Sequence, residues 1–73
     1  MEKKILLIIN DIRMAKGLSP INVLEEGTDL RKDLGFSSFD LAELTVRVED
    51  EFGIDIFKDG IVNTIAEVYE KLK

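Results

Sequence analysis

The amino-acid sequence predicts an all-α fold, a small four-helix bundle with a long first loop and a short third helix. Apolar residues recur with helical spacing, two of the predicted helices begin with capping patterns, and the one β-rich run has no second strand to pair with. The 73 residues suffice for a single domain, residues 1–73. Because the chain has no cysteine, aliphatic packing must supply nearly all of its stability, and a hydrophobic content of 45% makes this feasible.

The first helix is predicted over residues 3–16. Four isoleucines of this segment fall at i, i+3, i+4 and i+7, on one helical face: Ile5, Ile8, Ile9 and Ile12. The run 4–9 is also compatible with the start of a strand. The helix is favoured because residues 11–16 continue the pattern without a turn signal until Gly17.

Residues 17–36 are predicted to form a loop, which is long enough that we expect it to have a role. Five apolar residues are spaced as anchors that pin the loop across the helices: Ile21, Val23, Leu24, Leu30 and Leu34. A short helical turn near Leu30 is compatible with this spacing.

The second helix is the most clearly defined element and is predicted over residues 38–52. Ser37 is the expected N-cap, and Asp40, at the third helical position, is its partner in a capping box. Phe36 and Leu41 flank the cap in the positions of a hydrophobic staple. Three local signals therefore agree on one helix start.

The C-terminal part of the chain is predicted to contain two further helices. The third helix, within residues 55–62, is expected to be short and irregular because Gly60 interrupts its apolar residues. The final helix begins at Thr64, which forms a threonine-x-x-glutamate capping box with Glu67, and it runs to the end.

Composition excludes several kinds of active site. The chain has no histidine and no cysteine, so it lacks a serine–histidine–aspartate triad, a thiol nucleophile and the usual zinc ligands. The acidic run 49–51 is interpreted as a solvated helix face, and the glycines are not grouped as in phosphate-binding loops. We therefore expect neither an enzyme nor a metal site.

Charge and hydropathy restrict the partners. The net charge of −5 disfavours nucleic acid and favours basic protein surfaces, although solubility alone also accounts for it. No segment is long enough to span a bilayer, and charged residues interrupt the apolar N-terminal run too early for a signal peptide. Together with the lack of cysteine, this favours a cytoplasmic location without stable membrane insertion. We also expect the chain to be a monomer.

Ser38 is the candidate functional residue. It occupies the first position of the second helix, where unpaired N–H groups and the helix dipole favour a negative charge such as a phosphodiester. Because Ser37 can serve as the cap, the hydroxyl of Ser38 is left free for modification by another enzyme. Serines are common at helix starts, so this position alone does not decide the role.

The second helix carries two apolar stripes. The core stripe consists of Leu41, Leu44, Val48 and Phe52. The second stripe lies on the other side, next to Ser38, and consists of Phe39, Ala42 and Val46. A surface helix does not need this second stripe, so we interpret it as a docking surface. The alternative is that it packs under the long loop.

An acidic rim flanks the second stripe and consists of Asp40, Glu43, Glu49 and Asp50. Arg47 interrupts this rim. It can pair with Glu43 and Glu51 at helical spacing, which weakens the local negative field.

The run DLGFSSFDLAEL at residues 33–44, followed by VEDEFG at residues 48–53, resembles the acyl carrier protein family. The hallmark of that family is aspartate-leucine-glycine, two spacers ending in aspartate, serine-leucine, and an acidic amphipathic helix that ends in glutamate-phenylalanine. The helix order, the long first loop and the start of the last helix at residues 63–65 are also similar.

The resemblance implies that Ser38 receives 4'-phosphopantetheine from coenzyme A through a phosphopantetheinyl transferase that uses magnesium. The thiol of this arm holds acyl groups as thioesters and presents them to acyl-transferring, condensing or adenylating enzymes with basic surfaces. The implied docking residues are Ser37, Phe39, Ala42, Glu43, Val46, Arg47, Glu49 and Asp50. The implied lining of an acyl pocket is Leu44, Val48, Ile56, Val62 and Ile65.

Three departures from the family pattern favour a specialised carrier over the housekeeping carrier of fatty acid synthesis. The usual aspartate and leucine on either side of the serine are replaced by Ser37 and Phe39. Arg47 stands where a small or neutral residue is usual, and the segment 57–62 is shorter. Two alternatives are left open: an aminoacyl carrier of the D-alanyl or peptidyl type, and a carrier-like interaction module without an arm.

Overall fold

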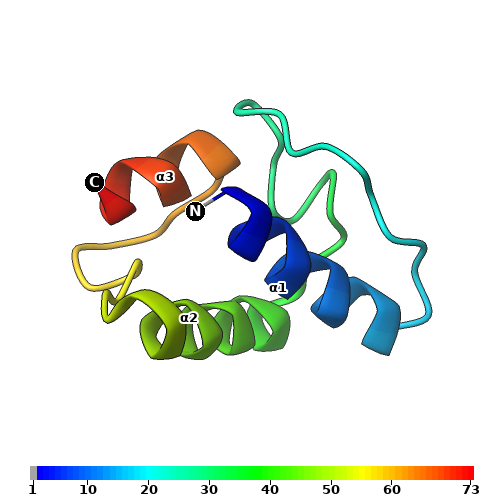
Figure 1. The fold of residues 1–73 in the computed structure, drawn as a ribbon, viewed down its shortest axis with the longest axis horizontal. Coiled ribbons are helices and arrows are strands. Elements are labelled where there is room, and N and C mark those ends of the chain that lie inside the picture. The colour runs from blue at the N-terminus through cyan, green and yellow to red at the C-terminus, as the bar shows by residue number, and fades with distance from the viewer. Residues whose placement is uncertain (1) are drawn as a thin grey trace.

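The computed structural model describes residues 2–73, and its architecture is all-α (Figure 1). The described chain forms three helices, α1 (Glu2–Ala15), α2 (Ser38–Phe52) and α3 (Ile65–Leu72). The all-α prediction is confirmed, and these helices match the first, second and last predicted ones. None of them is both long and apolar enough to cross a membrane.

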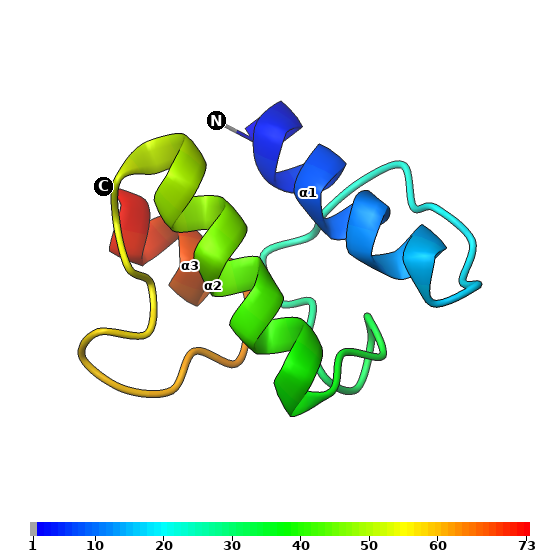
Figure 2. The ribbon, with the colours of Figure 1, turned by 90° about the horizontal axis from the view of Figure 1, so that it is seen from below.

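The three helices pack around a common interior. α1 and α2 run in roughly opposite directions, and α3 lies at the end of the molecule where α1 begins and α2 ends (Figures 1 and 2). Apolar side chains from all three helices and from both connecting loops form the buried core: Ile5, Ile9, Ile12, Leu30, Leu34, Phe36, Leu41, Leu44, Val48, Ile56, Val62, Ile65 and Val68. The predicted isoleucine face of α1 is therefore confirmed, with Ile8 only partly buried at its edge.

The predicted third helix is not confirmed. Residues 56–59 form turns, and the segment between α2 and α3 is a loop that curves away from the side of α2 (Figure 2). Gly60 has a φ of 137°, which is incompatible with continuing a helix. The few residues before it are too short a run to repay the cost of nucleating an isolated helix. The described chain is therefore a three-helix rather than a four-helix structure.

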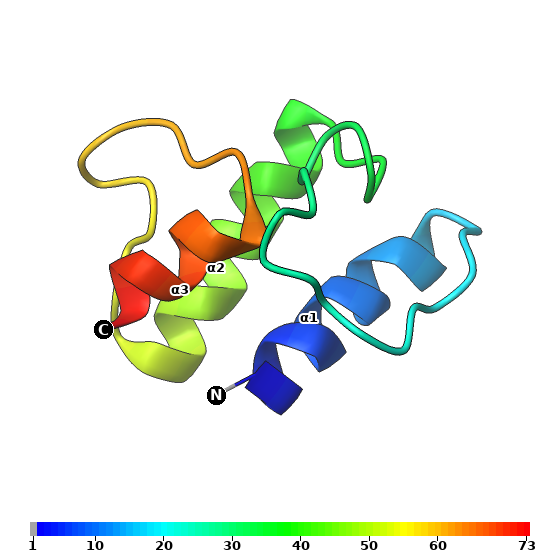
Figure 3. The same cartoon turned by 90° about the horizontal axis from the view of Figure 1, so that it is seen from above.

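The long loop between α1 and α2 is fixed by hydrogen bonds at several points. The Asn10 side chain donates to the Ile21 carbonyl at 2.9 Å and accepts from the Ile21 N–H at 2.9 Å. Further along, the Leu30 N–H donates to the Asn63 carbonyl at 2.8 Å, so this loop meets the segment before α3 (Figure 3). The loop preceding Ser38 is thus attached to both α1 and the C-terminal part of the chain.

The predicted loop anchors are confirmed with one exception. Leu30 and Leu34 are buried, and Ile21 and Leu24 pack against the core. Val23 is 71% exposed and is not an anchor. The expected helical turn near Leu30 is present as a single turn over residues 30–34.

Candidate functional site

The start of α2 has the capping geometry that the sequence predicts. The Ser37 Oγ accepts a hydrogen bond from the Asp40 N–H at 3.3 Å, and the Ser37 N–H donates to Asp40 Oδ2 at 2.8 Å. The Ser37 hydroxyl also donates to that carboxylate oxygen, at 2.9 Å. Ser37 is therefore fully engaged in ending the loop and starting the helix.

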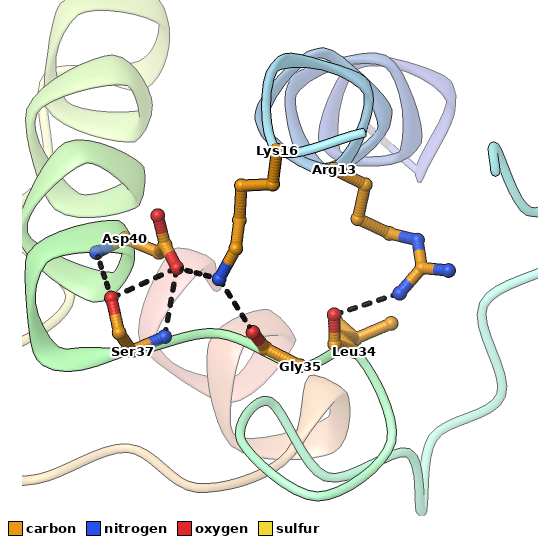
Figure 4. Close-up of polar contacts among 6 residues, drawn as sticks. All are labelled: Arg13, Lys16, Leu34, Gly35, Ser37 and Asp40. Carbon is orange, nitrogen blue, oxygen red and sulfur yellow. Dashed lines mark hydrogen bonds and ion pairs between the residues drawn. The ribbon is translucent and has the colours of Figure 1, made fainter. Parts of the chain in front are cut away.

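Asp40 is buried, which corrects its predicted place in the exposed acidic rim. Only 6% of the residue is accessible, because the capping box turns its carboxylate inward toward the end of α1. There the Lys16 ammonium lies 2.5 Å from Asp40 Oδ2 and donates to the Gly35 carbonyl at 2.7 Å (Figure 4). The hydrogen bond from Lys16, followed by those from Ser37, holds the pKa of Asp40 below its usual value, although burial acts in the opposite direction.

Arg13 is the second cation that holds the loop before α2. Its Nη1 donates to the Leu34 carbonyl at 2.7 Å (Figure 4). Its Nε donates to the Ser19 carbonyl at 3.0 Å. Arg13 and Lys16 together attach the end of α1 to residues 34–40. The segment that positions Ser38 is thus held by the end of α1.

Ser38 is the first residue of α2, and its side chain is exposed and takes no part in capping. Within residues 2–73 its hydroxyl has one side-chain partner, Arg31, whose Nη2 donates to Ser38 Oγ at 3.0 Å. A serine hydroxyl has two lone pairs and one proton, so this contact leaves the proton and one lone pair available. The first turn of the helix also has N–H groups without helical partners, which favour an anion at this position.

A largely apolar hollow of about 440 Å³ adjoins Ser38, between α2 and the loop that follows it. Its lining consists of Arg31, Ser38, Leu41, Ala42, Thr45, Asp55, Phe57 and Ile61. In the described part of the chain, acidic side chains do not gather in groups of three or more that would suit a metal ion. The largely apolar lining suits an apolar or uncharged group next to Ser38.

The residues predicted to line an acyl pocket do not line this hollow. All five are in the closed core and at most 1% exposed: Leu44, Val48, Ile56, Val62 and Ile65. Sequence reasoning missed five residues of the lining: Arg31, Thr45, Asp55, Phe57 and Ile61. Helical spacing could have predicted the part of the lining that comes from α2, because residues 38, 41, 42 and 45 share one helical face.

The second apolar stripe of α2 is exposed. Phe39 is 78% and Val46 is 66% accessible, and Ala42 between them is also exposed. The stripe does not pack under the long loop, so that alternative is wrong. Of the other predicted docking residues, Ser37, Glu49 and Asp50 are exposed and Glu43 is half-buried beside them.

Arg47 is tied into a small network on the surface between α1 and α2. Its Nε lies 3.0 Å from Glu43 Oε2, as predicted, and its Nη1 lies 3.4 Å from Asp11 Oδ2. The predicted pairing with Glu51 is wrong, because Glu51 turns toward α1 and pairs with Lys4 at 2.5 Å. The positive charge of Arg47 is thus largely neutralised by its two acidic neighbours.

Comparisons with known proteins agree on one family. The family model described as "Phosphopantetheine attachment site" matches residues 12–72. The acyl carrier protein of Saccharopolyspora erythraea is 38% identical over 53 residues, which cover 70% of this chain and 56% of that protein. The acyl carrier protein of Trieres chinensis is 40% identical over 48 residues, which cover 63% of this chain and 60% of that protein. The matched parts are thus less than two thirds of each relative, and no solved structure matches.

Proposed function

The chain belongs to the acyl carrier protein family, and on this basis we propose that Ser38 is the residue to which its 4'-phosphopantetheine arm is attached. Members of the family carry this arm covalently on a serine and act as carriers rather than as enzymes. One observation supports Ser38 above all. Its hydroxyl is exposed and free of capping at the first turn of α2, whereas the neighbouring hydroxyl of Ser37 is occupied.

The surroundings of Ser38 are suited to such an arm. The first turn of α2 favours the negative charge of a phosphodiester, and the adjoining hollow offers an apolar surface to the uncharged remainder. The bound arm supplies the terminal thiol that this cysteine-free chain lacks, on which acyl groups are held as thioesters.

The loading reaction is a transfer from coenzyme A by a separate, magnesium-dependent phosphopantetheinyl transferase. The Ser38 oxygen forms a bond to the phosphorus nearest the pantetheine. The pyrophosphate P–O bond breaks, and adenosine 3',5'-bisphosphate leaves with its electron pair. A base of the transferase takes the serine proton.

We propose that the exposed stripe of Phe39, Ala42 and Val46 is the docking surface for the transferase and for acyl-transferring, condensing or adenylating enzymes. Its exposure beside Ser38 supports this role. The flanking carboxylates Glu49 and Asp50 suit basic partners, whose approach they steer. We propose that the cargo on the arm is an acyl group used in fatty acid, lipid or specialised biosynthesis. We further propose that the chain acts as a single-domain, cytoplasmic monomer.

The attachment site is tested by incubating the protein with coenzyme A, magnesium and a broad-specificity phosphopantetheinyl transferase, followed by intact mass spectrometry. The wild type and Ser37→Ala are expected to gain the mass of one arm, and Ser38→Ala is expected to gain none. A wild type that stays unmodified, or a Ser38→Ala variant that gains the arm, contradicts the proposal.

The cargo is tested by the intact mass of the protein isolated from its native cell. An acyl thioester supports the proposed cargo, and an aminoacyl thioester identifies an aminoacyl carrier instead. Recovery of the unmodified chain alone would point to an interaction module that docks through Phe39, Ala42 and Val46 without an arm.

A further inference from the structure

Arg31 places a positive charge next to Ser38, and its guanidinium is not held in an ion pair within residues 2–73. Its Nη2 lies 3.0 Å from Ser38 Oγ. The two other arginines are engaged elsewhere, because Arg47 pairs with two carboxylates and Arg13 donates to two carbonyl groups. The guanidinium beside Ser38 is therefore the one that remains available to an anion.

The position of Arg31 is set by the loop before α2. Asp29 Oδ1 accepts hydrogen bonds from the N–H groups of Arg31 at 2.9 Å and Lys32 at 2.8 Å, which forms a tight turn. The intervening Leu30 is fully buried, and its N–H donates to the Asn63 carbonyl at 2.8 Å. The backbone of Arg31 is thus fixed on both sides, and its side chain extends along the hollow to Ser38.

We propose that Arg31 binds the phosphodiester that joins the arm to Ser38 and thereby positions the base of the arm at the hollow. This inference rests on the proposed attachment at Ser38. The phosphorus would be bonded directly to the oxygen that the guanidinium already contacts, so its free oxygens lie within two bonds of that atom. A planar guanidinium donates charge-assisted hydrogen bonds to such oxygens, and its charge offsets the single charge of a phosphodiester.

Two neighbouring lysines do not offer the same contact. The Lys16 ammonium is paired with Asp40 and the Gly35 carbonyl. Lys32 follows Arg31 in the same turn and is exposed, and no hydrogen bond or ion pair of its side chain with residues 2–73 is found. Lys32 is therefore a matched control: a cation one residue away, with the same backbone support and without the contact to Ser38.

The test uses phosphorus NMR of the loaded protein, in the wild type and in Arg31→Ala, Arg31→Lys and Lys32→Ala. Intact mass first establishes that each sample carries the arm. We expect the phosphodiester resonance to move in Arg31→Ala toward its position in the urea-unfolded protein, to move less in Arg31→Lys, and to stay unchanged in Lys32→Ala. The unloaded Arg31→Ala protein should keep the wild-type urea midpoint, which separates phosphate binding from a role in stability.

A second readout uses the wild type alone and does not depend on loading of the variants. The guanidinium nitrogen and proton resonances of Arg31 should shift on loading, whereas those of Arg47 should not. Loading without a shift of Arg31, or with the same phosphorus resonance in wild type and Arg31→Ala, overturns the role of Arg31 and leaves attachment at Ser38 intact. Failure of the wild type to load is visible in its mass and contradicts both proposals.

Discussion

Ser37 and Ser38 are consecutive in the chain, yet their hydroxyl groups have different partners. The Ser37 hydroxyl both accepts from the Asp40 N–H and donates to the Asp40 carboxylate, whereas the Ser38 hydroxyl points away from the cap and contacts Arg31. One serine is therefore part of the scaffold, and the other is available for chemistry.

Stability should depend on Ser37 and not on Ser38. Replacing Ser37 by alanine removes the N-cap and one donor to Asp40, and we expect the free energy of unfolding to fall by about 1 kcal/mol. Ser38→Ala removes no cap and should stay within about 0.5 kcal/mol of the wild type. Urea unfolding followed by circular dichroism measures both. Equal losses in the two variants would contradict the assignment of Ser37 as the sole cap.

Lys16→Met should loosen the junction between α1 and α2. The substitution leaves the buried Asp40 carboxylate without its ammonium partner, and we expect the free energy of unfolding to fall by about 1–2 kcal/mol. The loss is smaller than for a fully buried ion pair because Lys16 is partly exposed to solvent. Lys58→Met serves as the control, since this exposed lysine has no side-chain partner within residues 2–73. We expect a lower urea midpoint for Lys16→Met than for Lys58→Met. Equal midpoints would show that Lys16 acts only as a surface charge.

Asp40 should make the stability of the protein sensitive to acid. Its folded-state pKa is lowered below the ordinary value of 3.8, chiefly by the hydrogen bond from Lys16. The unfolded chain then binds a proton more readily than the folded one, so this stabilisation is complete above the ordinary pKa and is lost as the pH falls through the folded pKa. Carbon-13 NMR of the Asp40 carboxyl measures the shift directly. In Lys16→Met, the titration should move up toward the ordinary value, and an unchanged titration would show that Lys16 is not the main cause.

Phe39 should matter for docking and hardly for stability. It is 78% exposed, so Phe39→Ala should change the free energy of unfolding by no more than about 0.5 kcal/mol. If its ring anchors the transferase, kcat/KM for loading should fall about tenfold, the loss expected for an important interface aromatic. Val23→Ala, at a residue 71% exposed in the long loop, is the control and should load normally. Equal loading of both variants would remove Phe39 from the docking surface.

Local sequence signals predicted the helices well because each signal is satisfied within a few residues. The spacing of the isoleucines in α1 and the caps at Ser37 and Thr64 involve contacts between near neighbours in the chain. The third predicted helix is not confirmed, and its apolar residues lie in different surroundings. Ile56 is buried, while Ile61 is 79% exposed.

The site was predicted in part, and the missing part depends on distant contacts. Helical spacing predicted the exposed stripe of α2, and the capping pattern predicted that Ser38 is the first residue of this helix and lies outside its cap. The contact of Asp40 with Lys16 joins residues that are 24 apart in the sequence, and the pairing of Arg47 with Asp11 spans 36 residues. Arg31 lies only seven residues from Ser38. The chain between them is not a continuous helix, so helical spacing does not predict that their side chains meet.

The central claim is that the Ser38 hydroxyl, and not that of Ser37, carries the arm. Fragmentation mass spectrometry of the loaded protein tests it most directly, because backbone cleavage between the two serines separates their masses. We predict that the added mass resides on fragments that contain Ser38 and is absent from N-terminal fragments that end at Ser37. Added mass on those N-terminal fragments would contradict the account.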